Sequence, residues 1–576
     1  MREAMEERIW HESYPDEVPI SLEPYPEQSL YKILDDATEG FPDRPAIAFL
    51  GNHLTYAELH DEVKRMAAGL AALGVGRYDR VGLILPNCPQ FIIGYYAALR
   101  LGAIAVGNNP LYTKRELTHQ LADAGCKVVI VLDQLYPTLE ASRADLPDLE
   151  HVIATKITDY MRPPLSWLAP LKFRREAKAE GRPWPPVPDG ADVAWWSDVM
   201  DRDDPIPPVA EIDAHNDIAA LVYTGGTTGL SKGAKLTHFN LVANAIQNKA
   251  WFPGLEDGEE AGLCVLPFFH SYGMTVAMNI GILRAGKLIL IPRPSETEQV
   301  LKAIDKERPT LFPGVPRLYI AINEAAAGRD IDMTSIRACF SGAAKMPVAV
   351  MERFEAATKS TIVEGYGLTE TSPTTHANPI KGTRKPGSVG LPFPDTDCRV
   401  VDLDDPTRDV EQGQPGELLI AGPQVMAGYW NKPEETEQSF IDGWYRTGDV
   451  VQMDEDGYFY IVDRIKEMIN VSGFNVYPSD VEEVLYQHPK VEKAAVIGVP
   501  DDTTGEAVKA FLVLRDGETA TAGEIIEWCR DPETGLTGYR VPKHIEFRDS
   551  IPETMVGKVL RRELVEEERA KRSAVE

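Results

Sequence analysis

The chain has 576 residues, of which 43% are hydrophobic and 26% charged, and its formal net charge is −30 at pH 7. This apolar fraction excludes a mainly disordered chain, and the length predicts two or more domains. So negative a surface excludes a general nucleic-acid binder, because it would repel the phosphate backbone. An anionic ligand must therefore be met by a local site.

Cysteine usage and the first residues bear on the cellular compartment. Six cysteines are scattered without a CxxC pair or companion histidines at metal-ligand spacing, which predicts reduced, buried thiols. The acidic start, MREAMEERIWHESYPDEVP, does not have the basic beginning and apolar core of a signal peptide. No segment approaches the roughly eighteen consecutive apolar residues of a membrane span. We therefore expect a cytoplasmic protein.

From about Ser29 to Leu135, helical and strand-like segments alternate. The stretch RVGLILPNCPQFIIGYYAALRLGAIAVGNNP predicts a strand, a helix and a second strand, and KVVIVLD predicts a further buried strand. This alternation indicates a parallel sheet with helices on its faces. Proline then becomes frequent and the periodicity weakens, which predicts an insertion or surface excursion over 157–208. The α/β pattern resumes afterwards through Phe340.

The last third of the chain has a different character. Short strands with closely spaced turns predict a β-rich subdomain over 386–462. Beyond Asp463, the segments KAAVIGVPD, EAVKAFLVL and HIEFRDSIP predict strands separated by two helical stretches. The expected fold is α/β, with a large domain over 1–464 of parallel or mixed sheets flanked by helices. A small α+β domain over 465–576 completes it.

The strongest chemical signal is LVYTGGTTGLSKGAKLTH, from Leu221 to His238, which lies between a buried strand, IAALVY, and a helix, FNLVANAIQ. Glycine-rich backbone exposes consecutive N–H groups that can wrap phosphate oxygens. Hydroxyl groups and one positive charge are added by Thr224, Thr227, Thr228, Ser231 and Lys232. A linker is the alternative, but linkers rarely join a buried strand to a helix. The P-loop spacing G-x-x-x-x-G-K-[ST] is absent, so the sequence predicts a different kind of polyphosphate loop.

The loop closely resembles the signature of the adenylate-forming superfamily, which includes acyl-CoA synthetases, luciferases and peptide-synthetase adenylation domains. The family's companion motifs follow in order: EGYGLTE (364–370), YRTGD (445–449), DRIKEMINVSGFNVYPSDVE (463–482) and PETMVGKVLRREL (552–564). The resemblance extends from about Ser29 to the C-terminus. The segments NNPLYTKRELTHQLADAG, GPQVMAGYW and VSGFNVYP look most like bacterial long-chain fatty-acid CoA ligases.

The resemblance implies a role for each motif. The Gly-Thr loop covers the β- and γ-phosphates of ATP, Tyr366 offers a flat face for adenine, and Asp449 accepts both ribose hydroxyls. Thr228 and Glu370 are the implied ligands of Mg²⁺. The residues implied to bind ATP or coenzyme A are Thr224, Gly225, Gly226, Thr227, Gly229, Lys232, Gly342, Ala343, Glu364, Gly365, Tyr366, Gly367, Thr369, Asp449, Arg464, Lys466, Ser472 and Gly473.

The implied reaction has two halves. A carboxylate attacks the α-phosphorus of ATP to give an acyl adenylate and pyrophosphate, and the thiol of coenzyme A then attacks the activated carbonyl and releases AMP. The implied catalytic residues are Lys558, which bridges carboxylate and α-phosphate, His270, which gates or positions, Thr228 and Glu370. Between the halves the C-terminal domain rotates about Lys466, and Gly473 permits close passage of pantetheine.

Several alternatives stay open at this stage. Phe268, Tyr272 and Met274 are expected to line the acyl pocket, but their sizes do not fix the acid, so an aryl acid or a carrier-protein acceptor competes with a fatty acid and coenzyme A. A noncatalytic binding protein of the same fold and a homodimer are further alternatives. The basic and aromatic segment YMRPPLSWLAPLKFRREAKAEGRPW predicts either peripheral contact with the cytoplasmic face of the inner membrane or an ordinary surface excursion.

Overall fold

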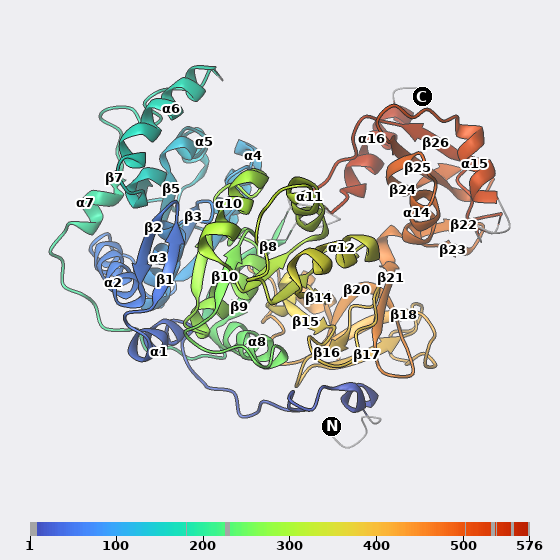
Figure 1. Ribbon diagram of the computed structural model, residues 1–576, viewed down its shortest axis with the longest axis horizontal. Helices are drawn as coiled ribbons and strands as arrows, with labels where there is room; N and C mark the ends of the chain where they lie inside the picture. Colours follow the sequence, from blue (N-terminus) through green and yellow to red (C-terminus); the bar gives the residue numbers. More distant parts are fainter. Residues whose placement is uncertain are drawn as a thin grey trace.

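The computed structural model describes residues 8–179, 181–224, 231–501, 503–530, 536, 538–554 and 558–573. Figure 1 shows a large α/β body, coloured from blue to yellow, and a smaller C-terminal domain, coloured orange to red, that stands to one side of it. The expected α/β fold class, with a large N-terminal domain and a small C-terminal one, is confirmed.

A seven-stranded sheet forms the first layer of the large domain. Its order is β7 (Ala194–Trp195), β6 (His151–Thr155), β5 (Val128–Leu132), β3 (Arg80–Ile84), β4 (Ile104–Asn108), β8 (Ile218–Thr224) and β9 (Lys232–Thr237). The pairs are parallel except β8–β9, which is an antiparallel hairpin. The glycine-rich loop therefore joins two strands, and the helix FNLVANAIQ begins only after β9. Lys232–Thr237 has little β propensity of its own, so its pairing with β8 decides this strand.

A nine-stranded sheet forms the second layer. Its order is β16 (Leu391–Pro392), β15 (Thr374–Ala377), β14 (Thr361–Gly367), β13 (Ala338–Ser341), β12 (Leu311–Gly314), β10 (Ala261–Cys264), β11 (Lys287–Leu290), β1 (Pro45–Phe49) and β2 (Asn52–Thr55). The central strands from β1 to β14 are parallel. The carboxyl ends of neighbouring parallel strands share one edge of a sheet, and ligands bind there in open α/β folds.

Helices cover both sheets and explain the near-continuous burial of the central strands. In the large domain they are α1 (Lys32–Gly40), α2 (Tyr56–Ala72), α3 (Pro89–Arg100), α4 (Lys114–Ala124), α5 (Tyr136–Ser142), α6 (Leu165–Ala179), α7 (Trp196–Met200), α8 (His238–Trp251), α9 (Ile280–Leu283), α10 (Thr297–Glu307), α11 (Pro316–Ala326), α12 (Val348–Thr358) and α13 (Pro433–Gln438). The predicted strand–helix–strand unit is observed as β3, α3 and β4. None of the described helices is long and apolar enough to cross a membrane.

Two smaller sheets complete the chain. An antiparallel five-stranded sheet holds β17 (Asp397–Val401), β18 (Gly416–Ala421), β19 (Phe440–Ile441), β20 (Trp444–Met453) and β21 (Phe459–Arg464). The C-terminal sheet holds β22 (Ile469–Val471), β23 (Phe474–Val476), β24 (Val491–Asp501), β25 (Gly505–Leu514) and β26 (His544–Phe547). Packed with that sheet in the C-terminal domain are α14 (Pro478–Tyr486), α15 (Ala522–Arg530) and α16 (Arg561–Ser573).

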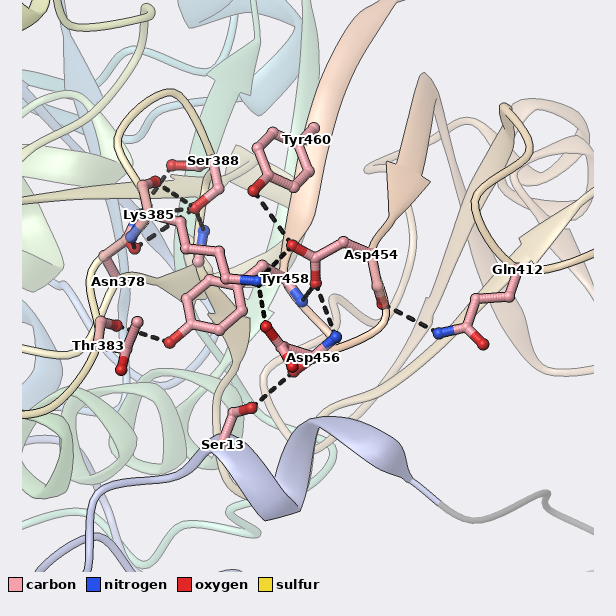
Figure 2. A network of polar contacts seen from close by, with 11 residues as sticks. Ser13, Asn378, Thr383, Lys385, Ser388, Gln412, Asp454, Asp456, Tyr458 and Tyr460 are labelled. Carbon is pink, nitrogen blue, oxygen red and sulfur yellow. Dashed lines mark hydrogen bonds and ion pairs between the residues drawn. The ribbon is translucent and has the colours of Figure 1, made fainter.

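A polar network anchors the turn between β20 and β21 to the large domain (Figure 2). The ammonium of Lys385 lies 2.6 Å from carboxylate oxygens of both Asp454 and Asp456 and above the ring of Tyr458. The N-terminal segment joins from the other side, where the Ser13 hydroxyl donates to the carbonyl of Asp456 over 2.8 Å. Because the two strands leaving this turn carry Asp449 and Arg464, the network helps to fix the strands on which these side chains stand.

Candidate functional site

Tyr366, Asp449 and Arg464 meet in one group, in which Asp449 is buried and the other two are half-buried. Asp449 on β20 pairs in register with Arg464 on β21, and Tyr366 approaches from the carboxyl end of β14. The Tyr366 hydroxyl donates to Oδ2 of Asp449 over 2.6 Å, and Nε of Arg464 lies 2.9 Å from Oδ1. The charge of Asp449 is the main reason that the pKa of Arg464 is raised. A carboxylate offers about four acceptor positions, so Asp449 can accept further hydrogen bonds from a ligand.

Glycines on both sides hold Tyr366 in place. A Cβ on Gly367 would lie 1.8 Å from the carbonyl oxygen of Pro373, and one on Gly365 would lie 2.2 Å from the ring of Phe340. Real Cβ atoms do not approach so closely, so only glycine fits at either position. The Gly-Tyr-Gly pattern is therefore required by close packing at the end of β14.

A buried carboxylate and a lysine share one tyrosine. The Tyr429 hydroxyl donates to Oε1 of Glu370 over 2.8 Å, and the ammonium of Lys232 lies 5.1 Å from the centre of the same ring. Burial raises the pKa of Glu370. Next to it, the hydroxyls of Thr369 and Ser271 lie 3.1 Å apart. Tyr429 and Ser271 were not among the expected site residues, although Tyr429 stands inside the quoted motif GPQVMAGYW and Ser271 directly follows His270.

The donor chemistry at Glu370 fits a magnesium ion. Among the described side chains only Tyr429 donates to this buried carboxylate, at Oε1, so most of its acceptor positions are available to a cation. No cluster of three or more His, Cys, Asp or Glu side chains suited to a metal lies in the part of the chain that the structure describes. Mg²⁺ commonly uses one or two carboxylates together with substrate phosphates, and a single carboxylate agrees with that habit.

Lys558 comes from the C-terminal domain yet lies among charges of the large domain. Burial and the positive charge of Arg464 lower the pKa of Lys558 to about 8, while the negative charge of Asp449 acts in the opposite direction. Burial, assisted by the charge of Lys558, lowers the pKa of His270 to about 4. His270 is therefore neutral near pH 7. The two groups face one site across the domain boundary.

The backbone around these two residues is held locally. The Lys558 N–H donates to the Thr554 hydroxyl over 3.0 Å, and the Thr554 N–H donates to the Lys558 carbonyl over 2.8 Å. His270 is followed by a π-helical turn, Gly273–Asn279, a feature that is rare and frequent at functional sites. Nδ1 of His270 accepts from the N–H of Tyr272 over 3.2 Å, so Nε2 is the nitrogen left to carry a proton.

The residues expected on the acyl side are buried. Phe268, Tyr272 and Met274 are each at most 6% exposed. The Tyr272 hydroxyl lies 2.8 Å from the carbonyl oxygen of Phe340, and its ring lies against Gly342. Ala343 follows in the left-handed region with φ 69°. The carboxylate of Glu364 accepts the N–H groups of Met346 and Gly387, each over 3.0 Å, so it positions the segment that carries Gly342 and Ala343.

Other expected residues lie apart from this group or beyond the description. Gly225, Gly226, Thr227, Thr228 and Gly229 lie outside the described residues. The ends of their loop are fixed, because Thr224 pairs with Lys232 and His119 contacts the Ser231 carbonyl. In the C-terminal domain, Lys466, Ser472 and Gly473 are exposed. Ser472 and Gly473 form the turn between β22 and β23.

Together, the buried aspartate on β20, the tyrosine between glycines and the buried lone carboxylate are typical of a nucleotide-binding α/β protein. Comparison with known families agrees: residues 34–430 match the AMP-binding enzyme family, and residues 480–558 match the AMP-binding enzyme C-terminal domain. The chain belongs to this family, as its resemblance to adenylate-forming enzymes predicted.

Individual proteins give further likenesses. The chain is 43% identical over 566 residues to a long-chain-fatty-acid–CoA ligase of Bacillus subtilis (strain 168), covering 98% of each chain. Among solved structures, it is similar to ATP-bound MatB from Rhodopseudomonas palustris, with a TM-score of 0.79, 29% identity and coverage of 94% of this chain and 98% of that one. It is also similar to the anthranilate CoA ligase AuaEII in complex with anthranoyl-AMP, with a TM-score of 0.82, 26% identity and coverage of 96% and 99%.

Proposed function

We propose that this protein is an AMP-forming fatty-acid CoA ligase acting on long- or medium-chain acids. It joins a fatty acid to the α-phosphate of ATP, releases pyrophosphate, and transfers the acyl group from the adenylate to the thiol of coenzyme A with release of AMP. The observation that carries the proposal is the position of Lys558, whose charge reaches Arg464, Asp449 and His270 from another domain. Full-length similarity to a long-chain ligase supports the choice of acid.

In the first half-reaction, positioning and charge do the chemical work. Asp449 holds the ribose hydroxyls, while Tyr366 keeps the carboxylate in register and stacks on adenine. The ammonium of Lys558 bridges the attacking carboxylate and the α-phosphate, where negative charge develops on the phosphate oxygens. His270 is neutral and therefore positions the substrate carboxylate without adding charge. The thiol is the nucleophile of the second half-reaction, and no side chain forms a covalent intermediate.

Glu370 is the proposed protein ligand of a magnesium ion. Glu370 would hold the ion together with Thr228 and phosphate oxygens, and the ion would offset charge on the phosphates. Tyr429 fixes the carboxylate through its hydrogen bond to Oε1. Lys232 lies over the same ring and adds positive charge at the phosphate end of the site.

The second half-reaction requires a different placement of the C-terminal domain. Residues 1–464 form the adenylating domain and residues 465–576 the mobile one, with the joint at the 3-10 turn Ile465–Glu467. Lys558 now occupies the site, whereas Ser472 and Gly473, the residues proposed to pass pantetheine, are exposed. Rotation of the domain exchanges one face for the other, so that a thiol reaches the adenylate.

Release of AMP and pyrophosphate tests the proposal directly. Purified protein is given Mg²⁺, ATP and carboxylates from acetate to oleate and benzoate, with and without coenzyme A. We expect saturable AMP formation that requires coenzyme A and is greatest with fatty acids. Preference for benzoate would favour an aryl acid, and pyrophosphate release without an acyl-CoA product would favour a carrier-protein acceptor. Nucleotide binding with no adenylation of any acid would refute the enzyme.

The α6 helix supports a peripheral place on the cytoplasmic membrane face. Its inner side, with Phe173 and Ala177, packs against the domain, whereas Leu165, Trp167, Leu168 and Leu171 are 52–72% exposed. The last turns expose Arg174, Arg175 and Lys178, which have no acidic partner within the described residues. Apolar side chains followed by basic ones suit the surface of an anionic bilayer, in which a fatty acid is dissolved. Figure 1 shows α6 at the outer edge of the molecule.

Vesicle sedimentation tests this docking surface. The native chain should bind vesicles of phosphatidylglycerol more strongly than vesicles of phosphatidylcholine, and less strongly at high salt. The double substitution Trp167→Ala and Leu171→Ala should weaken binding by about tenfold, because two exposed apolar side chains no longer enter the bilayer. Ile206→Ala, a change at another exposed apolar residue, is the control. Equal binding by all three would contradict the proposal, and self-association lost in the double variant would point instead to a second copy of the chain.

A further inference from the structure

Asp463 and Ser479 are in contact across the domain joint. Asp463 is the penultimate residue of the large domain's β21, where it pairs with Val450 of β20. Its Oδ2 accepts the N–H of Ser479 over 2.9 Å and lies 2.6 Å from the Ser479 hydroxyl. The same hydroxyl oxygen lies 2.6 Å from the carbonyl of Val462. Ser479 is the second residue of α14, so a side chain of one domain binds the first turn of a helix in the other.

This contact replaces a cap that α14 does not supply itself. The residue before the helix is Tyr477, which makes no side-chain capping bond, and Pro478 has no N–H to donate. The N–H of Ser479 is therefore the first that needs an acceptor, and a carboxylate near a helix N-terminus is the favoured one. Asp463 is 6% exposed, so water competes poorly for the bond.

The two partners belong to bodies that can separate. The helix α14 packs its Val481 and Leu485 into the core of the C-terminal domain. Arg561 lies 2.6 Å from Glu482 of α14 and also pairs with Glu467, which ties the chain after the joint to the same domain. Any turn of that domain about the joint at Ile465–Glu467 leaves Asp463 behind. The bond between Asp463 and Ser479 must then break.

Two other polar contacts across this boundary are weaker, because their side chains are exposed to water. Lys345 and Glu483 are 3.2 Å apart, with side chains 67% and 62% exposed. Arg317 and Glu553 are 3.9 Å apart, and the Arg317 side chain is 67% exposed. Exposed ion pairs contribute little, because water screens them and long side chains lose freedom. A buried cap therefore outweighs them in holding the two domains together.

We propose that Asp463 and Ser479 form a latch that favours the arrangement with Lys558 in the site and opens before the acyl group passes to coenzyme A. The latch rests on the two-step reaction proposed above and adds a positioning role for two residues that touch no substrate. Without the latch, the C-terminal domain spends more time rotated away from the site on the large domain. Lys558 is then supplied less often to the first half-reaction, while the second half-reaction meets no added barrier.

The half-reactions are measured separately on Asp463→Ala, which removes the cap, and on Ser479→Ala, which keeps the backbone N–H. Exchange of labelled pyrophosphate into ATP with oleate reports the first, and conversion of preformed oleoyl adenylate with coenzyme A reports the second. The loss of a helix cap corresponds to about a fivefold change in an equilibrium constant. We expect the first rate to fall about fivefold in Asp463→Ala and less in Ser479→Ala, with the second unchanged or faster. Glu483→Ala is the control, because it lies on the same helix and removes only the exposed ion pair with Lys345. It should leave both rates within about twofold of the native chain.

A distance measurement follows the latch without catalysis. Cysteines introduced as Asp404→Cys and Asp516→Cys stand on exposed positions of the two domains, and the six native cysteines are buried. Fluorescence energy transfer between labels at these positions measures how often the C-terminal domain is rotated away from the arrangement with Lys558 in the site. The ratio of the rotated to the unrotated population should rise about fivefold in Asp463→Ala. Thermal unfolding of each variant separates this shift from general damage, and Ser479→Ala carries the test where Asp463→Ala does not fold.

Three outcomes distinguish failure of the proposed function from failure of the latch. A native chain that makes no acyl-CoA refutes the proposed function, whatever the variants do. An active native chain whose variants lose both half-reactions equally, with unchanged energy transfer, overturns the latch and leaves Asp463 as a stabilising residue. Unequal loss of the half-reactions together with a shifted distance distribution supports it.

Discussion

The two sides of the site are built in contrasting ways. On the large domain, Tyr366, Asp449 and Arg464 are joined by direct contacts of 2.6 and 2.9 Å and stand on paired strands. On the C-terminal side, Lys558 follows a loop and its ammonium has no hydrogen-bond or ion-pair partner among the described residues. The large-domain group is therefore held by its own contacts, whereas the charge that we propose to be catalytic is unpaired among the described residues and free to leave. A group that must serve one half-reaction and vacate the site for the next cannot be bonded into a rigid framework.

Removing the mobile charge should have the largest effect. Lys558→Ala should slow pyrophosphate exchange at least a hundredfold, because one preorganised donor to a developing charge is worth about that much. Transfer from preformed acyl adenylate to coenzyme A should stay close to native, since Lys558 acts in the first half only. Stopped assays on each half-reaction measure this. Equal losses in both halves would contradict the division of labour, and Lys571→Ala, an exposed lysine of the same domain, is the control.

The pH dependence sharpens the same contrast. Lys558 must be protonated to offset charge on the α-phosphate, and its pKa is about 8, well below the ordinary value for lysine. The value of kcat/KM for adenylation should therefore be highest below pH 8 and fall as pH rises through about 8. In Lys558→Arg the guanidinium stays charged, so whatever activity is left should show no fall near pH 8. A fall at the same pH in that variant would assign it to another group.

A smaller effect is expected on the fixed side. Tyr429→Phe keeps the ring beneath Lys232 but removes the hydrogen bond to Glu370. The carboxylate then loses one of its restraints, and the apparent affinity for Mg²⁺ should weaken by about three- to tenfold. Titration of the ion, followed by both pyrophosphate exchange and tryptophan fluorescence, measures it. Tyr460→Phe, which removes a hydroxyl contact to Asp454 in the anchoring network, serves as the matched change away from the site.

Much of the fold followed from local sequence pattern. The strand–helix–strand unit at 80–108, the β-rich segment and the strands β24, β25 and β26 were expected where they occur, because burial imposes a period of two or 3.6 residues that a single segment displays. The short strands β22 and β23 were not predicted. The motif around Tyr366 could also be recognised from the sequence, because close packing allows only glycine on either side of it. The strand β9 was missed because its small residues carry no strand signal of their own.

Other features depended on residues far apart in the sequence. The Tyr366–Asp449 bond joins positions 83 residues apart, and the Tyr429–Glu370 bond joins positions 59 apart. No periodicity reports such a contact, because a hydrogen bond forms only when separately folded strands bring donor and acceptor within 3 Å.

The sequence by itself determined the class of fold and the family, because each depends on residue types at short spacing. Only the tertiary structure decided which partner each side chain has. It placed Lys558 among charges of another domain, gave Glu370 its tyrosine, and brought Asp463 of β21 to the first turn of the helix α14. The physical reason is that hydrogen bonds and charge interactions act over a few ångströms, and the chain reaches those distances only after its domains have packed.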